Sequence, residues 1–157
     1  MLRLPQLNLP LPQLNFGLTK LKPHPDSKLV LHQMNRDDST EIRQQITTIA
    51  SRFKMFECVE CAQTIRRFLI ESRISGKQIK LYTGSTEGYY GNIYHDGIQA
   101  VISTNGRHEG ILIILDGQEL VFDNIEKQGV SKEIWLQNLY SPILDIGEEF
   151  QITEIDF

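Results

Sequence analysis

Apolar residues recur along residues 56–71 at the spacing of one buried helical face. They lie three and four positions apart, at Cys58, Cys61, Ala62, Ile65, Phe68 and Leu69. Arg66, Arg67 and Glu71 fall on the opposite side of the same projection. Both cysteines are therefore expected to point toward the core, near the start of the longest predicted helix. Gly76 suits the left-handed residue that ends such a helix.

A second helical pattern precedes this one. Asp38 and Glu41 have the form of a capping box, which predicts a helix from about Ser39 toward Phe53. The apolar residues of its buried face are Ile42, Ile46, Ile49 and Phe53. The apolar phase slips near Lys54–Phe56, and we expect the two helices to be separated there.

Strands dominate the rest of the chain. They are predicted at Lys77–Thr83, Gln99–Ser103, Gly110–Leu115, Gln118–Phe122 and Phe150–Phe157, and apolar and polar residues alternate in the first and the last of them. Asp116-Gly117 predicts a tight turn between the third and fourth of these strands. Gly84–Gly97 is rich in Gly, Tyr and Asn and reads as a long loop that includes His95. Helices followed by antiparallel strands indicate an α+β domain.

A short helix is also predicted between the hairpin and the last strand. Ser131 suits its N-cap, and the helix would carry Ile134, Trp135 and Leu139.

The beginning of the chain has a different composition. Leu4-Pro5-Gln6-Leu7-Asn8 is repeated at residues 11–15, and Pro23 and Pro25 follow. Closely spaced prolines favour an extended backbone. We therefore divide the chain into a Pro/Leu-rich extended arm at residues 1–37 and a domain at residues 38–157.

Composition excludes several classes of protein. The chain has 157 residues and a formal net charge of −4. It has no basic stripe of the kind that binds nucleic acid, so a nucleic-acid-binding protein is not expected. Two cysteines do not make a disulfide framework, and no second ligand pair matches them for zinc. No apolar run spans a membrane, and no signal peptide is recognisable. We expect a protein that stays in the cytoplasm of the producing cell or leaves it by a non-Sec route.

The predicted hairpin brings candidate chemistry together. If Asp116-Gly117 is a two-residue turn, counting outward sets Gly110 opposite Asp123. His108 then becomes a diagonal neighbour of Asp123 on the same face, roughly 7–8 Å away at the backbone. An imidazole beside a carboxylate, with a cysteine on a nearby helix, supplies a base, its orienting group and a nucleophile.

Three interpretations of the two cysteines are possible. Cys58 lies nearer the helix start, where the dipole stabilises a thiolate, and is the better nucleophile. Alternatively, Cys58 and Cys61 are small core residues, because free cysteine is among the most buried residue types. Redox chemistry of the CxxC pair lacks the βαβ context of thioredoxin-like motifs.

Four segments together resemble the papain-fold toxin domains of bacterial polymorphic toxin systems, in particular the second papain-like toxin family. They are Phe56–Leu69, Ile74–Thr83, Ile102–Ile111 and Val121–Trp135, and the resemblance covers roughly residues 50–157. It implies a papain-like cysteine-hydrolase fold, with N-terminal helices packed on an antiparallel sheet. It also implies a catalytic triad of Cys58, His108 and Asp123, with no metal or organic cofactor.

The resemblance further implies a protease, deamidase or transglutaminase that acts on a protein substrate, and an immunity or inhibitor protein as a second partner. The rival expectation is a non-catalytic interaction module whose cysteines are structural. One feature departs from papain-like enzymes, which commonly carry a Gln before the Cys as an oxyanion-hole donor. None lies between Ala50 and Cys58, so backbone amides or Gln44 or Gln45 would take that role.

Overall fold

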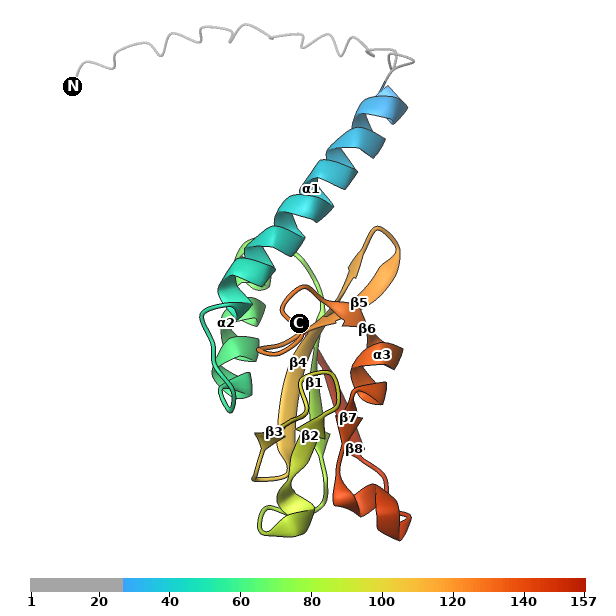
Figure 1. The fold of residues 1–157 in the computed structure, drawn as a ribbon. Helices are drawn as coiled ribbons and strands as arrows, with labels where there is room; N and C mark the ends of the chain where they lie inside the picture. The colour runs from blue at the N-terminus through green and yellow to red at the C-terminus, as the bar shows by residue number, and fades with distance from the viewer. Residues whose placement is uncertain (1–26) are drawn as a thin grey trace, which may run out of the picture.

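The computed structural model describes residues 27–157, with side chains from residue 38 onward. Three α-helices and two short 3₁₀ helices are present in this part of the chain. They are α1 (Ser27–Ala50), α2 (Cys58–Glu71), η1 (Tyr89–Gly91), α3 (Lys132–Gln137) and η2 (Pro142–Ile146). The predicted α+β class is confirmed (Figure 1).

The strands form two antiparallel sheets. A five-stranded sheet has the order β6-β5-β4-β1-β8, and a three-stranded sheet has the order β3-β2-β7. The strands are β1 (Lys77–Tyr82), β2 (Ile93–His95), β3 (Ala100–Ser103), β4 (Arg107–Leu115), β5 (Gln118–Phe122), β6 (Val130–Ser131), β7 (Leu139–Tyr140) and β8 (Gln151–Asp156).

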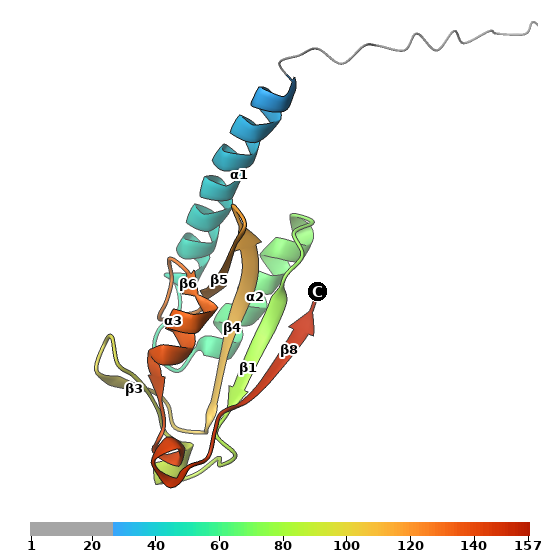
Figure 2. The same cartoon turned by 90° about the vertical axis from the view of Figure 1, so that its right-hand side faces the viewer.

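Two hydrophobic clusters lie on opposite faces of the larger sheet. Alternate residues of β4 divide between them, since Ile111 and Ile113 pack with α1 and α2 whereas Leu112 packs with Trp135 of α3. Figures 1 and 2 show α1 and α2 along one face, and α3 with the smaller sheet on the other. The domain is therefore layered, with β4 at its centre.

Helix α1 begins earlier than predicted. It starts at Ser27 rather than near Ser39, so Asp38 lies inside the helix and the predicted capping box was wrong. No Gly or Pro interrupts residues 27–50, so nothing in the sequence stops the helix from extending back. Residues 27–37, assigned to the extended arm, are helical. The repeat at residues 4–15 lies outside the described residues.

The predicted break between the helices is confirmed. Helix α1 ends at Ala50, three residues before the predicted end at Phe53, and α2 begins at Cys58. The predicted hairpin is also confirmed, with Leu115 paired to Gln118. Asp116 and Gly117 both have positive φ, at 50° and 78°, as a tight hairpin turn requires.

Two predictions in the second half were incomplete. Gly84–Gly97 is not only a loop, because it contains η1 and the strand β2. Leu139 belongs to β7, which pairs with β2, and not to the short helix. Both strands are too short for alternation to reveal them. The Ser131 cap is confirmed, since its hydroxyl accepts a bond from the N–H of Ile134.

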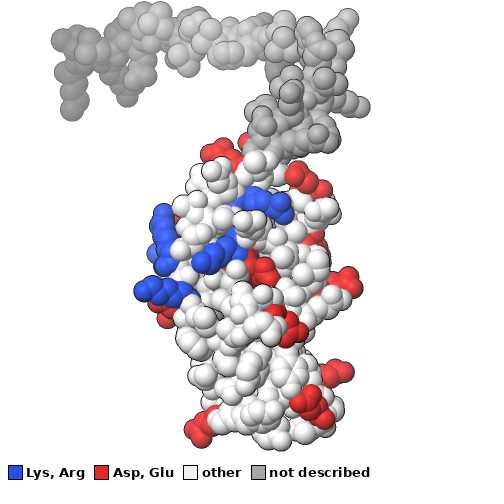
Figure 3. All heavy atoms as spheres, viewed as in Figure 1, with Lys and Arg blue, Asp and Glu red and all other residues white. Residues whose placement is uncertain are grey.

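Charges are unevenly distributed on the surface. On the face in Figure 3, basic side chains gather over the upper half near the helices, whereas the lower half shows only acidic ones. No basic stripe runs along this face. Within the described part of the chain, no helix is both long and apolar enough to cross a membrane.

Candidate active site

Cys58 is the first residue of α2, close to the helix start as predicted. Its side chain is 6% exposed, whereas Cys61, one turn further on, is completely buried. The first N–H groups of a helix lack intrahelical partners, and the helix dipole is positive at this end. The position of Cys58 therefore favours negative charge on its sulfur.

The hairpin brings His108 and Asp123 into direct contact. The last pair between β4 and β5 joins Ile111 to Phe122, so Asp123 directly follows the end of β5, and His108 lies in the part of β4 that extends past this pair. His108 Nε2 and Asp123 Oδ2 are 2.8 Å apart, and neither side chain is exposed. The predicted proximity of the two residues is confirmed.

The Asp123 carboxylate accepts several hydrogen bonds besides that from His108. The indole Nε1 of Trp135 donates to Oδ2 at 2.7 Å. The backbone N–H groups of Ile125 and Glu126 each donate to Oδ1 at 2.6 Å. A buried carboxylate with this many donors is strongly stabilised in its ionised form.

Trp135 belongs to the site, although only its place in the short helix was predicted. Its ring stacks on that of His108, with centroids 5.7 Å apart and planes 22° apart. Gly110 permits this packing, because a Cβ there would lie 2.8 Å from Val121 and 3.3 Å from the indole. A buried indole N–H needs an acceptor, but the sequence does not identify Asp123 as that acceptor.

The surroundings of His108 and Asp123 favour their charged forms. Burial alone would lower the pKa of His108, but the hydrogen bond to Asp123, the proximity of Cys58 and the charges of both groups raise it from 6.5 to about 9. Burial alone would raise the pKa of Asp123, but the bonds from His108 and Trp135 and the charge of His108 lower it below 3.8. At neutral pH the pair is an imidazolium and a carboxylate.

The remaining nitrogen of His108 is available to Cys58. Its Nδ1 is buried and makes no direct hydrogen bond within the described residues. The Cys58 thiol lies near enough to this ring to raise its pKa. Since Nε2 is bound to Asp123, proton exchange with Cys58 would pass through Nδ1.

Cys61 lies in a different environment. Burial, followed by the negative charges of Asp123 and Cys58, raises the pKa of its thiol from 9.0 to about 12. Cys61 packs in the cluster between the helices and the sheet. It therefore remains a neutral thiol at physiological pH, and the environment distinguishes the two cysteines as the helix pattern alone could not.

The amides that could bind an oxyanion lie at the start of α2. Gln45 donates to Glu41 on the same helix, at 3.5 Å. Among the described residues, neither Gln44 nor Gln45 makes a side-chain hydrogen bond to Cys58. The unpaired N–H groups of the first turn of α2 are the donors nearest the thiol in sequence.

A second histidine–carboxylate pair, His95 with Glu126, lies next to Asp123. His95, predicted to be in a loop, is instead a buried residue of β2, 3% exposed. Its Nε2 lies 3.0 Å from Glu126 Oε1, which also accepts a 2.8 Å bond from Asn138. The N–H of Glu126 binds Asp123, so this cluster adjoins the site without containing a nucleophile.

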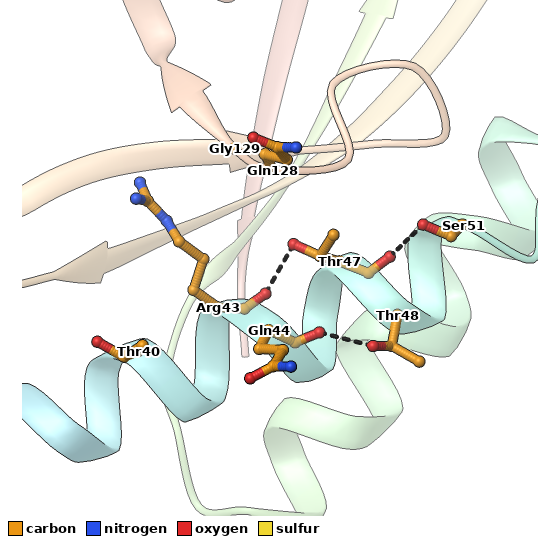
Figure 4. A pocket seen from close by; sticks show the side chains of 8 residues that line it. All are labelled: Thr40, Arg43, Gln44, Thr47, Thr48, Ser51, Gln128 and Gly129. Carbon is orange, nitrogen blue, oxygen red and sulfur yellow. Dashed lines mark hydrogen bonds between the residues drawn. The ribbon is translucent and has the colours of Figure 1, made fainter.

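A groove of about 620 Å³ lies elsewhere, between α1 and residues 128–129 (Figure 4). Its floor carries hydroxyl groups, but Thr47, Thr48 and Ser51 donate them to backbone carbonyls one turn earlier. None of Cys58, His108 and Asp123 lines this groove. Within residues 38–157, no cluster of His, Cys, Asp or Glu could hold a metal ion.

A cysteine at the start of a helix packed on an antiparallel sheet, facing a histidine of that sheet, is the arrangement of a papain-like domain. The model of the papain fold toxin 2 family matches residues 41–140. The chain belongs to this family of papain-fold toxins, and the expected papain-like fold is confirmed. Comparisons with curated proteins and with solved structures found no match.

Proposed function

We propose that this papain-fold toxin is a thiol enzyme that attacks a carboxamide or peptide carbonyl of a protein substrate. The observation that supports it best is that Asp123 holds Nε2 of His108 while Nδ1 of the same ring is buried without a partner among the described residues, in a ring whose pKa Cys58 raises. In this proposal Cys58 is the nucleophile, His108 the general acid and base, and Asp123 the orienting group.

The reaction begins with the Cys58 thiolate attacking the carbonyl carbon. The resulting oxyanion is stabilised by N–H groups at the start of α2. His108 Nδ1–H then protonates the leaving amine or ammonia as the carbon–nitrogen bond breaks, which leaves a thioester on Cys58. Asp123 stays ionised throughout and keeps the ring oriented.

Release of the acyl group regenerates the enzyme. His108 Nδ1 takes a proton from water, the hydroxide attacks the thioester, and the Cys58 thiolate leaves with the ring again protonated. Water yields proteolysis or deamidation, and an amine in its place yields transglutamination. As a toxin domain of this kind, the protein would be neutralised by an immunity protein that covers Cys58.

Labelling with iodoacetamide tests the proposal. Native protein is treated across pH 5–9, and the modified residue is identified by mass spectrometry. We expect Cys58 to react well below pH ~8.5, the ordinary pKa of a thiol. His108→Ala should abolish this reactivity, and Cys58→Ala should abolish activity on substrate. Cys61→Ala is the matched control and should leave both intact.

The low exposure of Cys58, 6%, favours a second candidate function. In that case the domain is a non-catalytic interaction module and both cysteines are core residues. Slow labelling of both cysteines until the protein unfolds would support the module and contradict the enzyme.

A further inference from the structure

Exposed apolar side chains flank Cys58 along the chain. Met55 is 41% exposed, Phe56 57% and Val59 38%, and they lie three and two positions before Cys58 and one after it. Single apolar residues on a surface need no explanation. Three of them within three positions of a candidate nucleophile do, because a substrate of Cys58 has to bind close to the start of α2.

Phe56 adopts a backbone conformation that is unfavourable for its side chain. Its φ is +72°, at the third position of the turn Lys54–Glu57, where glycine is usually found. Such a conformation is unfavourable for a bulky residue. The ring is mostly exposed, so burial in the core does not offset this cost. The ring is therefore positioned outward at the expense of stability.

This turn is fixed relative to the site. The N–H of Glu57 donates to the carbonyl of Lys54 at 3.2 Å, and the Glu57 carboxylate accepts from the N–H of Lys54 at 2.6 Å. The buried Asn124, next to Asp123, donates through Nδ2 to the same Lys54 carbonyl at 2.7 Å. Asn124 therefore holds the turn that carries Met55 and Phe56 in place, and binding of a ligand there needs little reordering.

We propose that Met55, Phe56 and Val59 bind an apolar side chain of the protein substrate, next to the carbonyl that Cys58 attacks. This inference rests on the proposed function. A substrate strand advances about 3.3 Å per residue, so the neighbours of the attacked residue must lie over side chains adjacent to Cys58. The three residues therefore select substrates with an apolar residue beside the target.

The test compares two alkylating reagents on the full chain. Iodoacetamide and N-hexyl iodoacetamide carry the same electrophile, so the ratio of their rates at Cys58 reports the apolar contact alone. We expect the hexyl reagent to react about tenfold faster, which corresponds to about 1.4 kcal/mol. Phe56→Asn, which tolerates a positive φ, should bring the ratio toward one, and Phe56→Tyr should retain the preference.

The matched control is Ile146→Asn, since Ile146 is 60% exposed on η2 and is not part of the turn. This variant should keep the wild-type ratio. A ratio near one in the wild type, or a preference that survives Phe56→Asn, overturns the inference. So does an equal acceleration of both reagents in Phe56→Asn, because the ring would then only shield the thiol.

Three further outcomes separate the possible failures. Iodoacetamide labelling that depends on His108 but shows no hexyl preference rejects this inference and keeps the proposed function. Failure of Cys58 to react with either reagent in the native protein rejects both. A preference that increases in the double variant Leu7→Ser, Leu14→Ser would assign the surface to the chain's own leucine-rich segment, and also contradicts a substrate site.

Discussion

Two buried histidines can be compared directly. His108 is bonded to Asp123 and His95 to Glu126, both through Nε2, at 2.8 and 3.0 Å. In both rings Nδ1 is buried without a hydrogen-bond partner among the described residues. The two histidines differ in a third neighbouring group, since the Cys58 thiol raises the pKa of His108. The carboxylates differ too, because Asp123 is fully buried and Glu126 is 20% exposed.

The comparison separates a histidine–carboxylate pair with a structural role from one that could also take part in catalysis. A histidine bonded to a carboxylate satisfies two buried polar groups, and this alone explains His95, which joins β2 to the loop after β5. Chemistry requires that the remaining nitrogen meet a group that can give up a proton. Four predictions can break or sharpen this distinction, and they follow from the largest expected effect to the smallest.

The largest effect is expected from replacing the two histidines separately. His108→Gln removes the imidazolium that would pair with a thiolate, and an ordinary thiol, with a pKa of about 8.5, is only about 1% ionised at pH 6.5. The rate of iodoacetamide labelling at that pH should fall roughly 100-fold. His95→Gln should leave it close to the wild-type value. Equal losses in the two variants would contradict the assignment of roles.

The carboxylates should differ in their contribution to stability. Asp123→Ala leaves a buried imidazolium unpaired, which typically costs about 3–5 kcal/mol. Glu126→Ala removes a partly exposed acceptor and should cost about 1–2 kcal/mol. Urea unfolding at pH 7 measures both free energies. A larger loss for Glu126→Ala would mean that the His95 cluster, and not the site, carries the buried charge.

The stability should depend on pH through His108. Its pKa is raised from 6.5 to about 9 on folding, so the folded state binds the proton more tightly. The stabilisation is complete below pH 6.5 and is lost as pH rises through 9. The free energy of unfolding should therefore decrease between these values. His108→Gln should flatten that dependence, whereas His95→Gln should preserve it.

The smallest effect concerns the donors behind each carboxylate. Trp135→Phe keeps an aromatic ring against His108 but removes the N–H that Asp123 accepts, at a cost of about 1–2 kcal/mol. Asn138→Ala removes the corresponding donor to Glu126, and water can replace it at this partly exposed site. Thermal unfolding should rank Trp135→Phe as the more damaging change. The opposite ranking would mean that the stability of the protein depends more on the donors to Glu126 than on those to Asp123.

The site was predictable where local rules determine geometry. Asp116-Gly117 defines a two-residue turn, and that turn sets the register that joins His108 to Asp123. The start of α2 was predictable within two residues because the apolar phase slips before Cys58. Both signals depend on neighbours along the chain and not on the final packing.

The rest depends on contacts between distant segments. Trp135 reaches Asp123 only because α3 packs on the face of β4 where Gly110 leaves room. The outward position of Phe56 follows from a positive φ that its residue type disfavours. The capping box at Asp38 misled because a local signal for a helix start was overridden by a longer helical segment.

Asp123 ties together a strand, a loop and a helix through the donors that surround it. In evolutionary terms, the two ends of the proposed triad are not equally free to change. Replacing Cys58 by serine would remove the thiol and leave this network intact, whereas losing Asp123 would endanger the fold. We therefore expect naturally inactivated copies of such a domain to lose the cysteine first, and to keep the His–Asp pair as a remnant.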